Sequence, residues 1–126
     1  MQADNNQQNT AKLTVDEVKK IVECGNYLMP FSQIAILLDR VGDANLELDF
    51  YTEGTSVYQH YRRGDIEFTM NMHRLMSKTL FSAATATDGK GINLEKNALL
   101  ALEAVRKRNG AILERETRQY QDRFLQ

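Results

Sequence analysis

The sequence contains one cysteine, one proline, two histidines and no tryptophan among 126 residues. A single cysteine, Cys24, excludes a disulfide within the chain, and Cys24, His60 and His73 cannot supply the four ligands of a zinc site. No apolar run approaches the roughly 20 residues that span a bilayer, and the first ten residues are rich in Gln and Asn. We therefore expect a cytoplasmic protein without metal, cofactor or membrane contact.

Charged residues are plentiful, but their signs are unevenly distributed. The chain has 16 Lys and Arg against 17 Asp and Glu, a net charge of -1. Residues 1–30 carry 3 cations and 4 anions (-1), residues 31–54 carry 1 and 5 (-4), and residues 55–126 carry 12 and 8 (+4). The length suits one small domain. Its middle segment is acidic and its C-terminal segment is basic.

The beginning of the chain predicts a loose segment followed by a helix. Residues 1–13 are expected to be a disordered leader, because they offer little apolar surface to offset the entropy of ordering. Thr14 and Glu17 have the spacing of a capping box, which marks a helix start. The helix should end near Gly25 and Asn26, where a left-handed residue is tolerated. Its expected inward face comprises Val15, Val18, Ile21, Val22 and Leu28.

The next segment predicts two short helices joined by a turn. Pro30 ends the first helix, and Ser32 is a candidate cap for a second helix with apolar residues at 34, 35, 37 and 38. A turn at 41–43 contains Gly42, and helical spacing resumes over residues 45–51. Thr55 or Ser56 can cap the next helix. Residues 14–54 therefore form a candidate helix-turn-helix module.

The rear of the chain predicts two long helices. Apolar or small residues recur at helical spacing at Val57, Tyr61, Gly64, Phe68, Met72, Leu75 and Thr79. A break at 88–91 precedes Asn93, the expected cap of a final helix with a buried row at Leu94, Ala98, Ala101, Leu102, Val105, Ile112, Leu113, Tyr120 and Phe124. The predicted fold is all-α, a helix-turn-helix bundle followed by a long antiparallel helical hairpin over residues 55–126.

The first long helix is apolar over a wider surface than one partner helix covers. A second row that includes Tyr58, Met70, Met76 and Leu80 widens its stripe. A large exposed apolar patch usually marks association, so we predict a homo-oligomer. The expected oligomer interface comprises Tyr58, Tyr61, Phe68, Met72, Leu75, Met76, Leu80, Leu102, Val105, Ile112 and Leu113.

No motif in the sequence predicts catalysis. The loop at 88–91 lacks the glycine and the hydroxyl residue that a phosphate loop requires around its lysine. His60 and His73 lie thirteen residues apart on one predicted helix, too far to share a metal ion. Neither Cys24 nor Ser32 has a base at a supporting spacing. We expect no catalytic residues and no enzyme.

The charge pattern argues against contact between the predicted recognition helix and nucleic acid. Asp43, Glu47, Asp49 and Glu53 make residues 45–51 and their flanks acidic, the wrong sign for packing against phosphates. Duplex DNA would have to meet basic and polar groups that lie mostly elsewhere. The candidate DNA-binding residues are Lys12, Lys19, Lys20, Ser32, Gln33, Arg40, Asn45, Arg62 and Arg63.

Two segments carry a resemblance to a known family. MPFSQIAILLDRVGD at 29–43 and SVYQHYRRGDIE at 56–67, with its Tyr-x-x-Tyr-x-x-Gly pattern, resemble the phage terminase small subunit. The resemblance implies a ring-forming, non-enzymatic component in the host cell cytoplasm that recognises viral DNA and regulates the terminase large subunit. The acidic segment 45–51 departs from this pattern, as does the short sequence after the final helix.

Two other functions fit the same residues. A dimeric helix-turn-helix transcriptional regulator would form a two-fold particle on paired half-sites. A helical virion or scaffold protein would oligomerise without binding DNA, its acidic front half meeting a basic protein.

Overall fold

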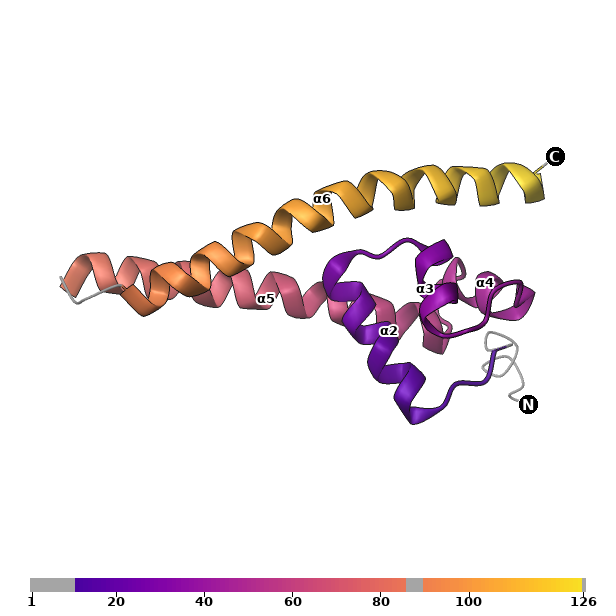
Figure 1. The fold of residues 1–126 in the computed structure, drawn as a ribbon, viewed down its shortest axis with the longest axis horizontal. Helices are drawn as coiled ribbons and strands as arrows, with labels where there is room; N and C mark the ends of the chain where they lie inside the picture. Colours follow the sequence, from indigo (N-terminus) through magenta and orange to yellow (C-terminus); the bar gives the residue numbers. More distant parts are fainter. Residues whose placement is uncertain (1–10, 86–89, 126) are drawn as a thin grey trace.

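The computed structural model describes the backbone of residues 11–85 and 90–125 and the side chains of residues 11–78 and 96–124. Its elements are α2 (Val15–Tyr27), α3 (Phe31–Leu37), α4 (Ala44–Phe50), α5 (Ser56–Thr85) and α6 (Lys90–Leu125). No strand occurs in the described backbone, which confirms the all-α class. Figure 1 shows α5 as a long rod crossed by α2, with α6 returning beside α5 and then diverging over the other helices. Most of the expected leader, residues 1–10, lies outside the described residues.

α2 starts as predicted and ends close to the predicted place, but with a different left-handed residue. The Glu17 backbone N–H donates to Thr14 Oγ1 at 3.1 Å, and the Thr14 N–H donates to Glu17 Oε1 at 3.0 Å, completing the capping box. α2 ends at Tyr27, close to the predicted end, but the left-handed residue is Leu28, with φ 51°, and not Gly25 or Asn26. Val15 is exposed, whereas Ile21, Cys24 and Gly25 are buried.

Gly25 lies inside α2 because α2 and α5 cross there with their backbones in contact. A Cβ added to Gly25 would lie 2.0 Å from the Tyr61 carbonyl oxygen, and one added to Gly64 would lie 1.9 Å from the Val22 oxygen. Neither carbonyl can move away without disturbing its helix. The pair therefore fixes where α2 and α5 cross.

The hydrophobic core lies where α2, α3 and α4 pack on the start of α5. The rings of Phe31 and Phe50 are 5.3 Å apart, and those of Phe50 and Tyr61 are 4.9 Å apart. The core cluster comprises Ile21, Cys24, Phe31, Ile34, Ala35, Leu38, Leu46, Phe50, Val57 and Tyr61. Because Val57 and Tyr61 belong to it, one core spans the predicted boundary at residue 54.

The first residues of α3, α4 and α5 test the predicted helix caps. Asp43 accepts from the Leu46 N–H at 3.0 Å and caps α4, which begins one residue earlier than predicted. Thr55 Oγ1 accepts from the Tyr58 N–H at 3.1 Å, confirming Thr55 as a cap. The predicted Ser32 cap is wrong, because α3 begins after Pro30 and no side chain of its own caps it.

The last three residues of the predicted leader are bound to the core. The Ala11 N–H donates to buried Asp49 at 2.8 Å, and Arg40 donates to the Lys12 carbonyl at 2.7 Å. Ala11 and Leu13 also pack against the core cluster. Residues 11–13 are therefore part of the folded body.

The two long helices differ in how much they bury. The predicted row on α5 is buried at Val57, Tyr61, Gly64, Phe68 and Leu75. In the described part of α6 the one buried residue is Asn109. Of the predicted buried row, Ala98, Ala101 and Phe124 are exposed, which corrects their assignment, and the partly buried members are Leu102, Val105, Ile112, Leu113 and Tyr120. The helix begins at Lys90, before the predicted Asn93 cap. The side chains of Asn93 and Leu94 lie outside the described residues.

Candidate assembly and nucleic-acid interfaces

The middle of α6 caps the carboxyl end of α2. Arg106 donates to the Gly25 and Asn26 carbonyls at 3.2 and 2.8 Å, and Asn109 Nδ2 donates to the Tyr27 carbonyl at 2.9 Å. The last carbonyls of a helix have no partner within it, so α6 satisfies three of them. This explains why Asn109, a polar residue, is only 4% exposed.

Arg106 also ties α6 to α5. Its guanidinium donates to Asp65 Oδ1 at 2.6 Å and lies 4.0 Å from the centre of the Phe68 ring. With its donors engaged and its side chain only 12% exposed, Arg106 is unavailable to an outside anion. Its neighbours Lys107 and Arg108 remain exposed.

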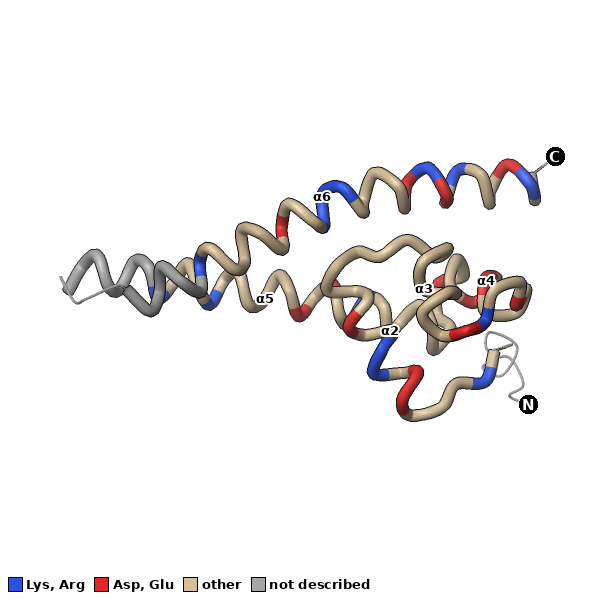
Figure 2. Tube along the Cα trace, viewed as in Figure 1, with Lys and Arg blue, Asp and Glu red and all other residues tan. Residues whose placement is uncertain are grey.

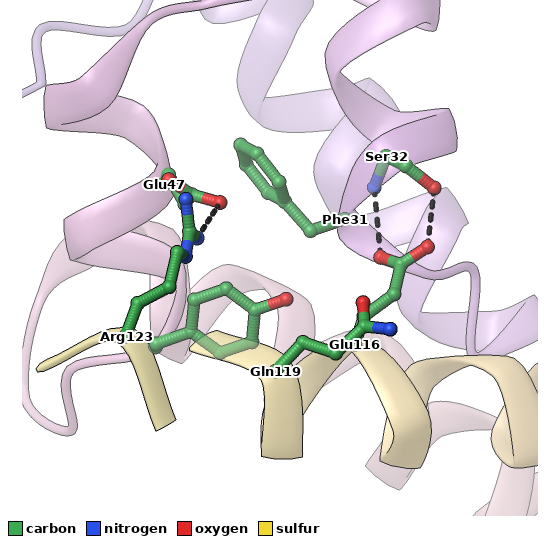
Figure 3. A pocket seen from close by; sticks show the side chains of 7 residues that line it. Phe31, Ser32, Glu47, Glu116, Gln119 and Arg123 are labelled. Atoms are coloured by element: carbon green, nitrogen blue, oxygen red, sulfur yellow. Dashed lines mark hydrogen bonds and ion pairs between the residues drawn. The ribbon is translucent and has the colours of Figure 1, made fainter. Parts of the chain in front are cut away.

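The C-terminal half of α6 contacts α3 and α4 around a cavity of about 420 Å³ (Figure 3). Glu116 accepts from the Ser32 backbone N–H at 3.1 Å and from Ser32 Oγ at 2.5 Å, and so supplies the cap that α3 lacks. Arg123 donates to Glu47 at 2.9 Å. The Tyr51 and Tyr120 rings stack with their centres 4.3 Å apart.

Three further cavities, of about 710, 330 and 410 Å³, adjoin one another along α6. The first two share Leu28, and the second and third share Tyr51 and Thr117. Together they extend along roughly 36 Å of helix, at 1.5 Å per residue between Leu100 and Phe124. This α6 groove is lined mainly by apolar and aromatic residues: Leu28, Phe50, Tyr51, Tyr58, Phe68, Leu100, Ala104, Leu113, Tyr120 and Phe124.

The structure divides the predicted oligomer-interface residues into three groups. Tyr61, Phe68 and Leu75 are buried within the monomer, Tyr61 donating to the Met29 carbonyl at 2.9 Å, which corrects their assignment to a free surface. Met76 is exposed, and Leu80 lies outside the described side chains. The others are partly buried: Tyr58, Met72, Leu102, Val105, Ile112 and Leu113. Of this group, Tyr58 and Leu113 line the α6 groove.

Several predicted DNA-binding residues are engaged inside the molecule. Arg40 holds the Glu17 carboxylate with two hydrogen bonds of 2.7 and 2.9 Å and pairs with Asp43 at 3.2 Å. Ser32 is bound by Glu116. Lys20 pairs with Asp16 at 3.1 Å, and Arg62 pairs with Asp65 at 3.0 Å. Arg40 and Ser32 are therefore structural contacts.

Other predicted DNA-binding residues remain accessible. Lys12, Lys19, Gln33, Asn45 and Arg63 are all exposed. Within the described side chains, Lys12, Lys19 and Arg63 form no ion pair. Figure 2 shows acidic residues gathered around α4, whereas both signs alternate along the C-terminal half of α6.

Four exposed apolar side chains, together named the α3–α4 face, lie on the predicted recognition elements. Its members are Ile36 and Leu37 of α3, Val41 of the turn and Leu48 of α4, which are 68, 45, 74 and 43% exposed. Arg40 is the only Lys or Arg among residues 31–54, and its charge is neutralised by Glu17 and Asp43. The segment therefore exposes apolar and acidic groups and no unpaired cation within its described side chains.

The reactive side chains of the core do not form a catalytic set. Burial, with a smaller effect from Glu23, raises the pKa of the Cys24 thiol to about 11, so the thiol stays protonated at neutral pH. Burial and then Arg63 lower the pKa of His60. The described residues contain no cluster of three side chains suited to a metal ion, and no described helix is long and apolar enough to cross a bilayer.

Comparisons with protein-family models, curated proteins and solved structures gave no match. The resemblance to the terminase small subunit therefore stays a prediction. The sequence reasoning missed Leu28, Tyr51 and Tyr120 as interface candidates. The sequence does contain a signal for Tyr120, a row at helical spacing formed by Leu113, Thr117, Tyr120 and Phe124. Whether this row is accessible depends on how far α6 diverges from α5, which the sequence did not predict.

Proposed function

We propose that this chain is a non-enzymatic, oligomeric DNA-binding adaptor, comparable in role to a phage terminase small subunit. The observation that carries the proposal is a set of exposed cations outside α4 that form no ion pair within the described side chains: Lys12, Lys19, Arg63, Lys96, Lys107, Arg108 and Arg115. Such groups attract phosphates regardless of sequence. Repetition of the chain in an oligomer multiplies a weak contact.

In this proposal, the helix-turn-helix module and the helical hairpin have separate tasks. Lys12 and Lys19 on the module and Arg63 on α5 meet duplex phosphates, while α4, which is acidic, does not enter a groove. The α6 groove and the exposed Met76 supply apolar surface for a homo-oligomer, in a ring if the contact closes. Contact with a terminase large subunit belongs to the same proposal and rests on the resemblance alone.

The first test is titration of labelled duplex DNA by fluorescence anisotropy at 50 and 200 mM salt. We expect binding at low salt that weakens steeply at higher salt, because each phosphate contact contributes a slope of about 0.9 in log affinity against log salt. The combined variant Lys12→Gln, Lys19→Gln and Arg63→Gln should weaken binding at least tenfold and flatten that slope. Arg118→Gln, which removes an exposed cation already paired with Glu114, is the control. Absence of binding at 50 mM salt would refute the DNA-binding part.

A second candidate function is a helical scaffold protein that oligomerises and ignores DNA. The α3–α4 face favours it, because exposed Ile36, Val41 and Leu48 beside acidic groups suit a protein partner better than a phosphate backbone. An oligomer that shows no salt-dependent DNA binding would select this function.

A further inference from the structure

Two successive parts of α6 are fastened to the rest of the molecule in different ways. In the first part, the Arg106 side chain is 12% exposed and Asn109 is 4% exposed, and both bind the last carbonyls of α2. Leu113, one turn further along α6, packs against the core cluster. These three residues form a largely buried anchor.

The second part, residues 116–124, is named here the α6 strap, and its polar contacts with α3 and α4 are open to solvent. Arg123 pairs with Glu47 at 2.9 Å, with side chains 57% and 27% exposed. Glu116 accepts two hydrogen bonds from Ser32, which is exposed. Figure 3 shows these two fastenings on opposite sides of the cavity of about 420 Å³. Each of them exchanges readily with water.

The strap is not close-packed against α3 and α4. Tyr51, which follows α4, stacks on Tyr120 but also lines two cavities, of about 420 and 410 Å³. Close-packed protein interiors contain few voids larger than a water molecule. Phe124, near the end of the strap, is 66% exposed. Lifting the strap therefore exposes little apolar surface besides the stacked rings.

A point at which α6 bends readily lies between the anchor and the strap. The Thr117 hydroxyl donates to the Leu113 carbonyl at 2.7 Å. A side-chain hydroxyl bonded to the carbonyl four residues earlier slightly destabilises a helix and often bends it. Gly110, three residues before Leu113, lowers the helix propensity of the same stretch. The strap can therefore lift while the anchor stays in place.

Closure of the strap acts directly on α3. This helix has seven residues and no side-chain cap of its own. Glu116 accepts from the Ser32 N–H at 3.1 Å and from the Ser32 hydroxyl at 2.5 Å, and so replaces the missing cap from 84 residues away. Helices as short as α3 are marginal in water without such contacts. An open strap therefore leaves the start of α3 less stable.

We propose that the α6 strap opens and closes as a unit, independently of the anchor, and that this motion couples the end of α6 to α3. An anion that takes Arg123 from Glu47 favours the open strap and thereby uncaps α3. By linkage, a contact that holds α3 in place favours the closed strap to the same extent. The proposal concerns contacts within one chain, so it stands apart from the DNA-binding and oligomeric parts of the proposed function.

Hydrogen exchange at single residues, measured on the full chain by mass spectrometry with electron-transfer fragmentation, reports the state of the strap. The Ser32 amide donates to Glu116, whereas the Met29 amide donates to the Cys24 carbonyl at 3.0 Å and reports the end of α2. Glu116→Ala removes the acceptor of Ser32 and should speed its exchange by about tenfold or more. The exchange rate of Met29 should stay unchanged.

The decisive variants lie elsewhere on the strap. Arg123→Gln and Tyr120→Ala remove contacts with α4 and the residue after it. Each should nevertheless speed exchange at Ser32 in α3 by about two- to tenfold, the worth of an exposed ion pair or a ring stack. Arg118→Gln is the matched control, because Arg118 pairs with Glu114 within α6. Raising salt from about 50 to about 500 mM should speed Ser32 in the wild type more than in Arg123→Gln.

A charge swap separates the ion pair from general destabilisation. Arg123→Glu places two carboxylates together and should open the strap, which speeds exchange at Ser32. Adding Glu47→Arg to this variant should restore slow exchange, because the pair then has opposite charges again. Thermal unfolding followed by circular dichroism verifies that each variant folds.

Three outcomes would overturn the proposal. Equal exchange at Ser32 in the wild type and Glu116→Ala would show that the strap does not close. If Ser32 responds to Glu116→Ala but not to Arg123→Gln or Tyr120→Ala, the contacts open separately. If Met29 speeds up together with Ser32 in these variants, α6 opens as one rod. None of these outcomes changes the expected DNA titration or particle mass, so failure of the strap is distinguishable from failure of the proposed function.

Discussion

Both α2 and α6 pack on α5, but they do so through different kinds of contact. α2 touches α5 backbone to backbone at Gly25 and Gly64 and shares an apolar core with it. α6 is held by hydrogen bonds and ion pairs from Arg106, Asn109, Glu116 and Arg123, with Leu113 packed against the core and Tyr120 stacked on Tyr51.

The difference has an energetic meaning. Apolar burial contributes in proportion to the area removed from water, so α2 and the start of α5 should unfold together. Hydrogen bonds and exposed ion pairs exchange readily with water and contribute little net free energy each. We therefore expect α6 to open more readily than α2, although Arg106 and Asn109 are largely buried.

The largest effect should come from Gly64→Ala, which attacks the α2–α5 crossing. Its Cβ would lie 1.9 Å from the Val22 carbonyl oxygen, so the free energy of unfolding should fall by roughly 3 kcal/mol or more. Gly110→Ala is the matched control, since its Cβ would meet only Leu28 Cδ1 at 3.8 Å. That change should stabilise the helix by about 0.5–1 kcal/mol. Equal urea midpoints for the two variants would contradict the backbone contact.

A smaller and more local effect is expected from Arg106→Ala. The change leaves the Gly25 and Asn26 carbonyls and the Asp65 carboxylate without this donor, and should cost about 2 kcal/mol. Hydrogen exchange should speed up in α6 more than in the core of α2. As a control, Arg108→Ala changes an exposed residue two positions along α6. It should change the free energy of unfolding by less than about 0.5 kcal/mol. Uniform loss of protection across α2 and α6 would show that the two regions are not separable.

The smallest effect should be the pH dependence contributed by Glu17. Burial alone would raise the pKa of its carboxyl, but hydrogen bonds from Arg40 and the Thr14 backbone outweigh burial and lower it. A lowered folded pKa stabilises the protein above the unfolded pKa, and this contribution is lost as pH falls through the folded value. Urea midpoints of wild type and Glu17→Gln should therefore converge between pH 7 and pH 3. A Glu103→Gln variant should track the wild type, and a constant gap for Glu17→Gln would refute the linkage.

Local rules predicted the parts of the fold that depend on neighbouring residues. The Thr14 capping box, the Thr55 cap and the buried row of α5 follow from spacing within one segment. The roles of Gly25 and Gly64 could not be predicted, because a glycine at a helix crossing resembles one at a helix end until the partner is known. For the same reason the role of Arg106 could not be predicted, because the carbonyls that it binds lie about eighty residues earlier in the chain.

Leu28 shows how a single backbone conformation can determine the shape of a surface far larger than itself. A left-handed φ costs a leucine roughly 1 kcal/mol more than a glycine, and glycine would close α2 more easily. Glycine, however, would remove the aliphatic wall between two of the cavities along α6. The chain therefore tolerates a local conformational penalty at the corner after α2, and in return one aliphatic side chain lines both of these cavities.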